Sequence, residues 1–406
     1  MRTKTKTCRA SLTHRPAAKT AREAGLISLA LAAVCLLPAL THAGTSESNG
    51  NTADLDTMTV NLYVGAGTER VLALDPADPG YLSNLVFTVT GIYYEIAASE
   101  PGLRLQQVAD TIAARLPDLV AVQEASLIRL QSPGDLISGG SIPATNIVFD
   151  YLAILTDALA ARGASYRVAS VREELDVELP MFNLSTGTFD DARLTDRDAI
   201  LVRADLPPNH LRIRHTDSGT FSHVLQIPSI GLTVKRGWCS ADVSLFGRDF
   251  RYICTHLEEE TSPTLQNQQA LELIDGPAHT QLPVLLCGDF NSDPLHRDGS
   301  FAYDTLVGEN LRDAWAARHP ASPAGGLTWG HDETLSDPSA LFDRRIDLIL
   351  FSTGDFTPSA AEVLDMATNQ ALPPLWASDH AAVFARLRFH GSSAPAHERR
   401  EHDARD

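Results

Sequence analysis

The chain has 406 residues, of which 44% are hydrophobic, and a formal net charge of −18 at pH 7. This length and composition allow a sizeable hydrophobic core in one large domain. The acidic balance argues weakly against a nucleic-acid-binding protein, because affinity for nucleic acids depends largely on Lys and Arg side chains that neutralise phosphates. A local basic groove is still compatible with it.

Residues 1–43 have the pattern of a secretory signal peptide. Residues 1–24 contain seven basic side chains against one acidic side chain, an apolar run follows at 25–40, and the small residue Ala43 ends the segment. This order is typical of export with cleavage near Ala43, and Pro38 leaves the run too short to span a bilayer comfortably. Cleavage would change the net charge from −18 to −24. We expect a protein exported to the periplasm or the extracellular space.

The rest of the chain divides into a leader, one domain and a tail. Residues 44–56 are small and polar, which predicts a flexible leader. Residues 391–406 are charged and lack an apolar period, which predicts a disordered tail. No internal repeat and no second boundary are visible between them, so residues 57–390 are predicted to form a single domain.

The first half of this domain alternates strand and helix patterns. A strand is predicted at 58–64, a helix that ends before Pro117, a strand at 118–125 and an amphipathic helix at 146–162. The apolar segment 81–98 is expected to be a buried helix or strand, with a lid or a membrane-touching element as the alternative. The remainder of 126–198 is rich in Gly and turn residues and is predicted to form long surface loops.

The second half contains mostly strands. They are predicted at 199–206, 239–246, 251–257, 283–290, 345–351 and 380–389. A helix from Pro263 through Ile274 begins after Ser262, a typical N-cap residue that precedes proline. Many short strands with a few helices indicate an α/β protein of two packed sheets with helices outside.

Three cysteines remain after removal of the predicted signal peptide, namely Cys239, Cys254 and Cys287. A hairpin that turns near Phe246 would place Cys239 opposite Cys254, and such neighbours in an exported protein could form a disulfide. The alternative is buried small hydrophobic residues, because strand-pair geometry is often wrong for a disulfide. No Cys-x-x-Cys zinc spacing is present.

Polar side chains recur at the ends of the apolar strands. They are Asn61, Glu124, His256, Asp289, Asn291, Asp347, Asp379 and His380. Burying so many polar groups without partners would cost roughly several kcal/mol per group, so we expect them to converge in one cleft, where they satisfy one another or a cation. Oxygen ligands without a cysteine motif suit Mg²⁺, with Mn²⁺ or Ca²⁺ as alternatives, better than zinc.

Six motifs in this order resemble a known family. They are "TVNLYVG", "DLVAVQEA", "YICTHLE", "CGDFNSDP", "RRIDLIL" and "ASDHAAV", between residues 58 and 389. They resemble the endonuclease/exonuclease/phosphatase superfamily, which includes pancreatic deoxyribonuclease, apurinic endonucleases, neutral sphingomyelinases and inositol polyphosphate 5-phosphatases. The resemblance implies a four-layer α/β sandwich of two packed mixed sheets and a magnesium-dependent phosphoester hydrolase.

The resemblance also implies a role for each strand-end residue. Glu124 matches the acid that binds the catalytic metal, Asn61 matches a metal-linked or phosphate-orienting amide, and Asp379 a further metal-site acid. The remaining residues match catalytic positions of the family.

Among these, His380 matches the general base that activates water, and Asp347 the carboxylate that orients it. Asp289 and Asn291 match the pair that aligns the water and the phosphoryl oxygens. His256 matches the histidine that stabilises the phosphoryl oxygens or assists the leaving group. Histidine suits the base role because its pKa lies near neutrality without tuning.

The substrate stays open at this stage. A phosphodiester is expected, in a nucleic acid, a phospholipid or a small phosphoester. A nuclease would need basic side chains around the cleft, for which Arg197, Arg236, Arg344 and Arg345 are candidates. No obligate protein partner is evident, and a monomer is expected. The alternative to an enzyme is an inactive family member that acts as a binding module.

Overall fold

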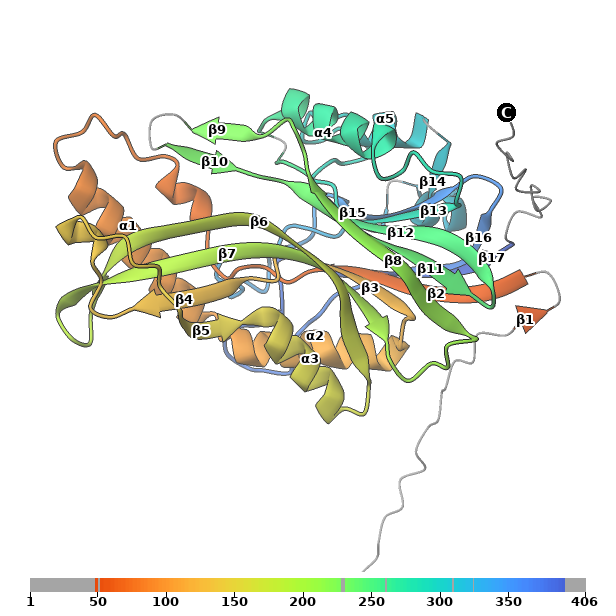
Figure 1. Ribbon diagram of the computed structural model, residues 1–406, viewed down its shortest axis with the longest axis horizontal. Helices are drawn as coiled ribbons and strands as arrows, with labels where there is room; N and C mark the ends of the chain where they lie inside the picture. The colour runs from red at the N-terminus through yellow and green to blue at the C-terminus, as the bar shows by residue number, and fades with distance from the viewer. Residues whose placement is uncertain are drawn as a thin grey trace, which may run out of the picture. The chain divides into compact units, whose positions relative to one another are not determined.

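The computed structural model describes residues 48–49, 52–227, 231–259, 261–308, 310–323 and 325–390. The predicted signal peptide, residues 44–47, 50 and 51 of the predicted leader, and the predicted tail lie outside the described residues. Within the described part, two β-sheets pack face to face and helices cover their outer faces (Figure 1). This is the predicted four-layer α/β sandwich.

The larger sheet is mixed. Its described strands are β1 (Ser48–Asn49), β2 (Thr52–Asn61), β3 (Leu119–Gln123), β4 (Leu127–Gln131), β5 (Asn146–Asp150), β6 (Tyr166–Asn183), β7 (Thr188–Arg203), β16 (Phe356–Leu364) and β17 (Ala382–Phe389). They follow the order β16–β17–β2–β3–β7–β4–β5, with β1 beside β2 and β6 beside β7. Only β2 and β3 run parallel among these described pairs.

The smaller sheet is also mixed. Its described strands are β8 (Leu211–Thr220), β11 (Gly237–Leu245), β12 (Arg248–His256), β13 (Val284–Asp289), β14 (Leu311–Asp313) and β15 (Asp347–Ser352). They follow the order β14–β15–β13–β12–β11–β8, and β12 runs parallel to β13. A separate antiparallel pair consists of β9 (Leu225–Ile227) and β10 (Leu232–Val234).

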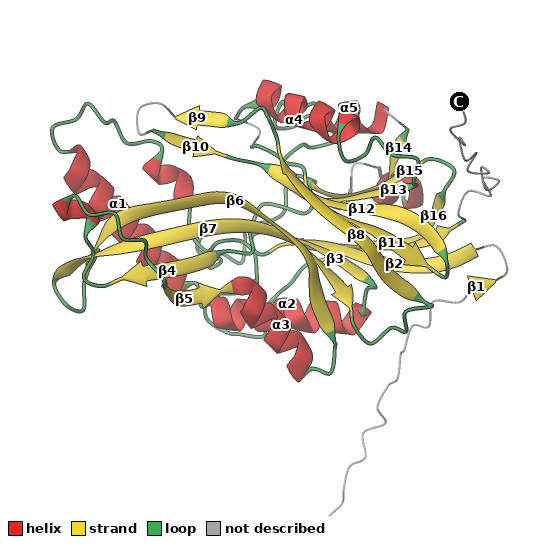
Figure 2. Ribbon diagram, viewed as in Figure 1, coloured by secondary structure: helices red, strands yellow, loops and turns green. Residues whose placement is uncertain are grey.

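The helices lie outside the sheets (Figure 2). They are α1 (Tyr81–Ala98), α2 (Pro101–Arg115), α3 (Tyr151–Ala161), α4 (Pro263–Asp275), α5 (Ala302–Gly308) and α6 (Ala314–Arg318), with 3₁₀ turns η1 (Thr68–Val71) and η2 (Leu136–Ser138). Helices α2 and α3 pack on the larger sheet, and α4 and α5 on the smaller one. No helix in the described ranges has the length and apolar character needed to cross a membrane.

The alternation of side chains along each strand builds the two kinds of core. In β3, Leu119 and Ala121 face the smaller sheet, whereas Val120 and Val122 face helices α2 and α3. Successive strand residues point to opposite faces, so a strand that is buried on both sides reads as a continuous apolar run. This packing fixes the ends of the strands, and with them the positions of the predicted site residues.

The prediction of long surface loops within 126–198 is wrong. Strands β6 and β7 form a long antiparallel hairpin there, and β4 and β5 pair beside it. One face of this hairpin is polar because charged residues pair across it, for example Arg193 with Asp176. A strand with a charged face resembles loop sequence in composition.

Two smaller boundaries also differ from the sequence prediction. The helix expected at 146–162 begins only at Tyr151, because residues 146–150 form β5 and Asp150 caps the helix through the Ala153 N–H. Strand β2 begins inside the predicted flexible leader, where Leu55 is fully buried and Asp56 pairs with Arg386 of β17. Segment 81–98 is the helix α1, with one face buried as expected.

The predicted pairing of two cysteines across a hairpin is confirmed, but the structure has no disulfide between them. Cys239 lies directly opposite Cys254 in the β11–β12 hairpin. Both are buried free thiols, and so is Cys287. In the structure they act as small core residues between the two sheets.

Candidate active site

Three of the predicted residues lie side by side at one end of the smaller sheet. His256 ends β12, Asp289 ends β13 and Asp347 begins β15. The ladder pairs His256 with Asp289 and Asp289 with Asp347. Residues that are directly opposite in neighbouring strands project to the same face, so the register alone brings one imidazole and two carboxylates together.

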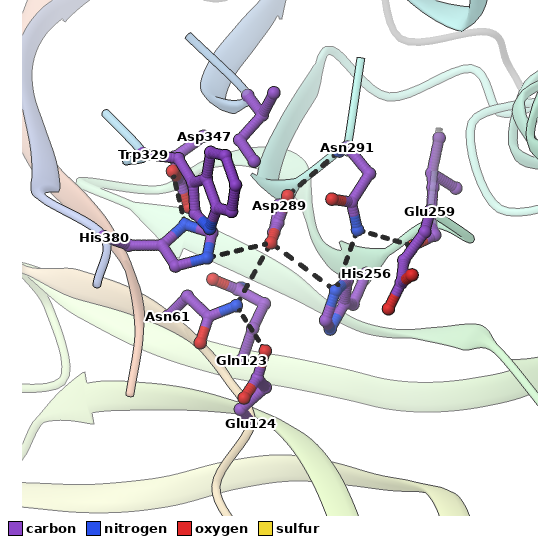
Figure 3. Close-up of polar contacts among 12 residues, drawn as sticks. Asn61, Gln123, Glu124, His256, Glu259, Asp289, Asn291, Trp329, Asp347 and His380 are labelled. Atoms are coloured by element: carbon purple, nitrogen blue, oxygen red, sulfur yellow. Dashed lines mark hydrogen bonds and ion pairs between the residues drawn. The ribbon is translucent and has the colours of Figure 1, made fainter. Parts of the chain in front are cut away.

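The larger sheet supplies the rest of the site. Asn61 ends β2 and lies opposite Gln123, the last residue of β3, so Glu124 follows at the same sheet end. Asp379 and His380 come just before β17, the other neighbour of β2. The two sheets therefore bring seven of the eight predicted residues to one place (Figure 3), and Asp379 Oδ1 lies beside them, 3.9 Å from His380 Nε2.

Asp289 lies at the centre of this cluster. Its Oδ2 accepts a hydrogen bond from Asn61 Nδ2 at 3.1 Å, and Oδ1 accepts one from the Asn291 N–H at 2.9 Å. The same Oδ2 lies 3.4 Å from His256 Nε2 and 3.8 Å from His380 Nε2 (Figure 3). Asp289 thus connects residues from both sheets.

His380 and Asp347 form a buried imidazole–carboxylate pair. His380 Nδ1 lies 2.9 Å from Asp347 Oδ2, and the His380 backbone N–H donates to Ser378 Oγ at 3.1 Å. A carboxylate at one ring nitrogen fixes the orientation and tautomer of the imidazole. Nε2, the ring nitrogen remote from Asp347, is therefore the one that faces Asp289.

His256 has a different environment, dominated by a buried guanidinium. Arg236 Nη1 lies 2.9 Å from His256 Nδ1. A guanidinium can only donate, so Nδ1 accepts and Nε2 carries the N–H that faces Asp289. Burial, then the charges of Arg236 and His380, lower the pKa of His256 well below its ordinary value. His256 is a neutral hydrogen-bond donor.

Asn61 holds two carboxylates together. Its Nδ2 donates to Glu124 Oε1 at 2.9 Å as well as to Asp289, and its Oδ1 accepts the Tyr63 N–H at 2.9 Å. Glu124 Oε2 accepts the Val64 N–H at 2.9 Å. The nitrogen of the amide thus faces the two carboxylates and positions them, and its oxygen faces the Tyr63 N–H.

Two site residues have strained backbones. Glu124 and Asn291 have φ values of 53° and 47°, in the left-handed region that non-glycine residues seldom adopt. Such a conformation costs roughly 1–3 kcal/mol and tends to occur where the surrounding structure fixes a functional side chain. Glu124 comes directly after strand β3, and Asn291 lies two residues after the end of strand β13.

The site concentrates negative charge in a buried space. Burial and the charge of Asp347 raise the pKa of Asp289 to about 7. Burial, with Glu124 adding to it, raises the pKa of Asp379 to about 6. Burial lowers the pKa of His380, but the surrounding carboxylates outweigh it and raise that pKa well above its ordinary value. Burial and the neighbouring carboxylates therefore disfavour the ionised forms of Asp289 and Asp379.

A divalent cation fits this donor set. Asp289, Asp347 and His380 offer ligand atoms that lie within 4.8 Å of one another, and the buried Asp347 Oδ1 accepts no hydrogen bond among the described residues. Glu124 and Asp379 add carboxylates, and no cysteine takes part. Oxygen-rich sites of this kind suit Mg²⁺, Mn²⁺ or Ca²⁺. The structure therefore contains a candidate site for a divalent metal.

Several supporting residues escaped sequence reasoning. Thr328 Oγ1 accepts the Asp347 N–H at 3.1 Å, and Trp329 Nε1 donates to Asp379 Oδ2 at 3.2 Å. Both lie in an irregular segment without periodicity, where the polar-aromatic sequence "LTWG" could have indicated them. Arg236, considered above for substrate binding, is 9% exposed and holds His256 instead.

Solved structures share this fold. An endonuclease/exonuclease/phosphatase family protein from Leptotrichia buccalis C-1013-b has a TM-score of 0.50 at 15% identity, covering 82% of this chain and 100% of that one. A mannosyl-6-phosphatase of Bacteroides thetaiotaomicron has a TM-score of 0.47 at 18% identity, covering 82% and 99%. At these identities the likeness concerns the fold alone. No curated protein sequence shows significant similarity to the chain.

Fold and site together define a phosphoester hydrolase of the α/β sandwich class. Residues 58–380 match the Endonuclease/Exonuclease/phosphatase family. The match spans most of the chain and runs from strand β2 to His380, so it includes all eight residues of the site. The chain belongs to this family.

Proposed function

We propose that the protein is an exported, Mg²⁺-dependent phosphodiesterase in which His380 activates the attacking water. The observation that carries this proposal is the arrangement around Asp289, where the His380–Asp347 pair, His256 and the Asn61–Glu124 pair converge. Each of these groups has a use in displacing an alcohol from phosphorus by water.

Glu124 and Asp379 would hold the cation, and Asn61 Nδ2 binds both Glu124 and Asp289 beside it. Bound there, Mg²⁺ would draw negative charge from the phosphoryl oxygens and so make phosphorus accessible to a nucleophile. Asn61 keeps Glu124 and Asp289 at a fixed separation through its two hydrogen bonds. Mn²⁺ or Ca²⁺ would fit the same oxygen donors.

His380 would take the proton of the attacking water at Nε2. A cation held by the neighbouring carboxylates would offset the negative charges that raise the pKa of His380, and so leave its imidazole neutral for this step. Its Nδ1 is bound to Asp347, which stabilises the imidazolium that forms, as in hydrolase triads. Asp289 lies 3.8 Å from that Nε2 and is suited to orient the water. Thr328 Oγ1 accepts the backbone N–H of Asp347 at 3.1 Å, which fixes the main chain that carries this carboxylate.

His256 would donate a hydrogen bond to a phosphoryl oxygen. Arg236 makes its Nδ1 an acceptor, leaving Nε2–H directed at the site. A neutral imidazole donates a hydrogen bond well and a proton poorly, so we infer stabilisation of the phosphoryl oxygens and not protonation of the leaving group. Asn291 Nδ2 lies 3.2 Å from that Nε2 and donates to the carbonyl oxygen of Leu257, so it adds a second N–H donor beside His256.

The arginines of the chain bear on the nuclease alternative. Arg345 is 2% exposed and pairs with Asp313, and Arg236 binds His256. Arg197 is bound to Asp150 and to the carbonyl of Ala125. The fourth candidate, Arg344, stacks on Trp329, with its guanidinium carbon 3.8 Å from the ring centroid. All four candidates for phosphate-backbone contacts thus have partners within the protein, and this supports a substrate other than a long nucleic acid.

The remaining parts of the proposal rest on the sequence. Export to the periplasm or beyond rests on residues 1–43. Action as a monomer on a phosphoester, without an obligate partner, is the simplest reading of one domain that carries the whole site. An inactive binding module is the alternative, and it is disfavoured because every expected polar position is filled.

Hydrolysis of bis(p-nitrophenyl) phosphate by the purified chain tests the proposal. We expect release of p-nitrophenol with added Mg²⁺ or Mn²⁺ and its loss with EDTA. Glu124→Gln and His380→Ala should each lower kcat about a hundredfold or more, whereas Glu362→Gln, an exposed carboxylate on β16, should leave it unchanged. Activity that ignores both EDTA and the two site variants would refute the assignment.

A further inference from the structure

A cavity of about 390 Å³ adjoins the active site, and the proposed reaction leaves most of it unused. Helix α1, the β6–β7 hairpin and the β9–β10 pair form its walls, on the left in Figure 1. Its volume lies in the range of small-molecule sites. Glu124, which binds Asn61 in the active site, lines one end of the cavity. The cavity therefore borders the active site at Glu124.

One face of the hairpin changes from apolar to charged along the cavity. Two cross-strand pairs line the apolar part, Leu179 with Ala192 and Val177 with Leu194. Because side chains alternate along a strand, residues 192, 194 and 196 share this face. Asp196 follows the apolar pairs and lies 3.6 Å from Arg236, the partner of His256. The charged end of the cavity is thus the end at the active site.

The opposite wall is apolar as well. Helix α1 contributes Val89, Ile92 and Ile96, all of which are buried on the cavity side. On its outer surface the same helix exposes Phe87, which is 81% exposed. The hairpin tip contacts α1 through the Leu184 N–H and Tyr94 Oη, 3.0 Å apart, and exposes the Leu184 side chain to 66%. Both wall elements therefore carry an exposed apolar side chain.

We propose that this cavity binds the hydrocarbon chain of a lipid phosphoester whose phosphate lies at Asp289 and His380. The inference rests on the proposed function and names its substrate class. Glu124 and Arg236 line the cavity and contact Asn61 and His256 of the active site, and this proximity favours a part of the substrate over a separate partner. The lining offers aliphatic side chains to methylene groups, and the exposed apolar residues of α1 and the hairpin tip suit the uptake of an amphiphile.

Two synthetic diesters isolate the contribution of the chain. Methyl p-nitrophenyl phosphate and octyl p-nitrophenyl phosphate react alike: water forms a bond to phosphorus, p-nitrophenolate leaves, and an alkyl phosphate monoester remains. Below the concentration at which the octyl ester aggregates, the wild-type protein with Mg²⁺ or Mn²⁺ should have at least tenfold higher kcat/KM for it, because each buried methylene adds roughly 0.8 kcal/mol. Equal values for the two esters would overturn the inference.

Variants of the cavity wall identify where the chain binds. Ala192→Phe fills the cavity and should reduce the octyl-to-methyl ratio about tenfold, while Ala160→Phe, at an exposed position of α3, should keep the wild-type ratio. Leu194→Ser places a hydroxyl on the same wall and should lower the ratio if the first variant fails to fold. A ratio unchanged in the folded cavity variant overturns the inference alone. Metal-independent or absent hydrolysis of the methyl ester overturns the proposed function instead.

Discussion

Arg104 is a buried cation that links the two backbone segments on either side of the site. It is 0% exposed, and one of these segments follows Asn61 while the other precedes His380. Its guanidinium donates to the carbonyl oxygens of Ser99, Leu62, Ala377 and Tyr63, at 3.0, 2.9, 2.8 and 3.0 Å. We expect Arg104→Met, which cannot donate, to destabilise the fold and misalign the site.

The magnitude follows from the groups left behind. Each buried carbonyl without a donor costs roughly 1–3 kcal/mol, which gives about 4–12 kcal/mol for four. Removing the charge recovers part of its desolvation penalty, of the order of several kcal/mol. The net loss in the free energy of unfolding is therefore expected to be about 3–5 kcal/mol. The activity should fall as well, because the segments that carry Asn61 and His380 lose their common anchor.

Urea unfolding followed by circular dichroism measures this loss, with kcat on the short diester as the second readout. Arg115→Met on the same helix is the matched control. Arg115 is exposed and pairs with the exposed Glu362 at 2.7 Å, an interaction expected to contribute less than about 1 kcal/mol. An Arg104→Met protein within 1 kcal/mol of the wild type would show that the carbonyls do not depend on this cation.

Two further predictions concern buried carboxylates. Asp347→Asn should leave the fold intact and lower kcat by roughly 10²–10⁴-fold, because the amide no longer selects the tautomer of His380 or stabilises its cation. Steady-state kinetics measure this loss. A loss below tenfold would contradict the assignment of His380 as the base. Burial raises the pKa of Glu174 to about 8, and neither of its oxygens has a hydrogen-bond partner within the described residues. The folded state then binds this proton more tightly than the unfolded state, so its contribution to stability is complete below about pH 4.5 and is lost as the pH rises through 8. Glu174→Gln should flatten that decline in urea unfolding between pH 5 and 8.5, and an unchanged slope would disprove the pKa direction.

The site could be found in the sequence because its residues terminate apolar strands. Asp289 and His256 follow runs that can only be buried, and the ladder register then brings their side chains together. The orientation of Asn61 could not be predicted in the same way. Which end of an amide faces the carboxylates depends on the Tyr63 N–H, a contact that exists only in the folded chain.

The strands around the cavity escaped prediction for another reason. Along β6 and β7 the polar face carries Arg193 and Asp176, whose cross-strand pairing compensates for a composition typical of loops. The apolar face is completed only when α1 packs on it, from more than 70 residues earlier in the chain. Likewise, Thr328 and Trp329 lie in an irregular segment, and their importance appears only through Asp347 and Asp379.

Equilibrium titration of the metal-free protein with Mn²⁺, followed by calorimetry, tests the central claim most directly. The account predicts one ion per chain in the wild-type protein, binding at least tenfold weaker in Glu124→Gln, and binding within about threefold of the wild type in Asp347→Asn, because Asp347 serves the imidazole. Binding that survives loss of Glu124 but disappears with Asp347 would contradict it and would assign the ion to the Asp289–Asp347–His380 cluster instead.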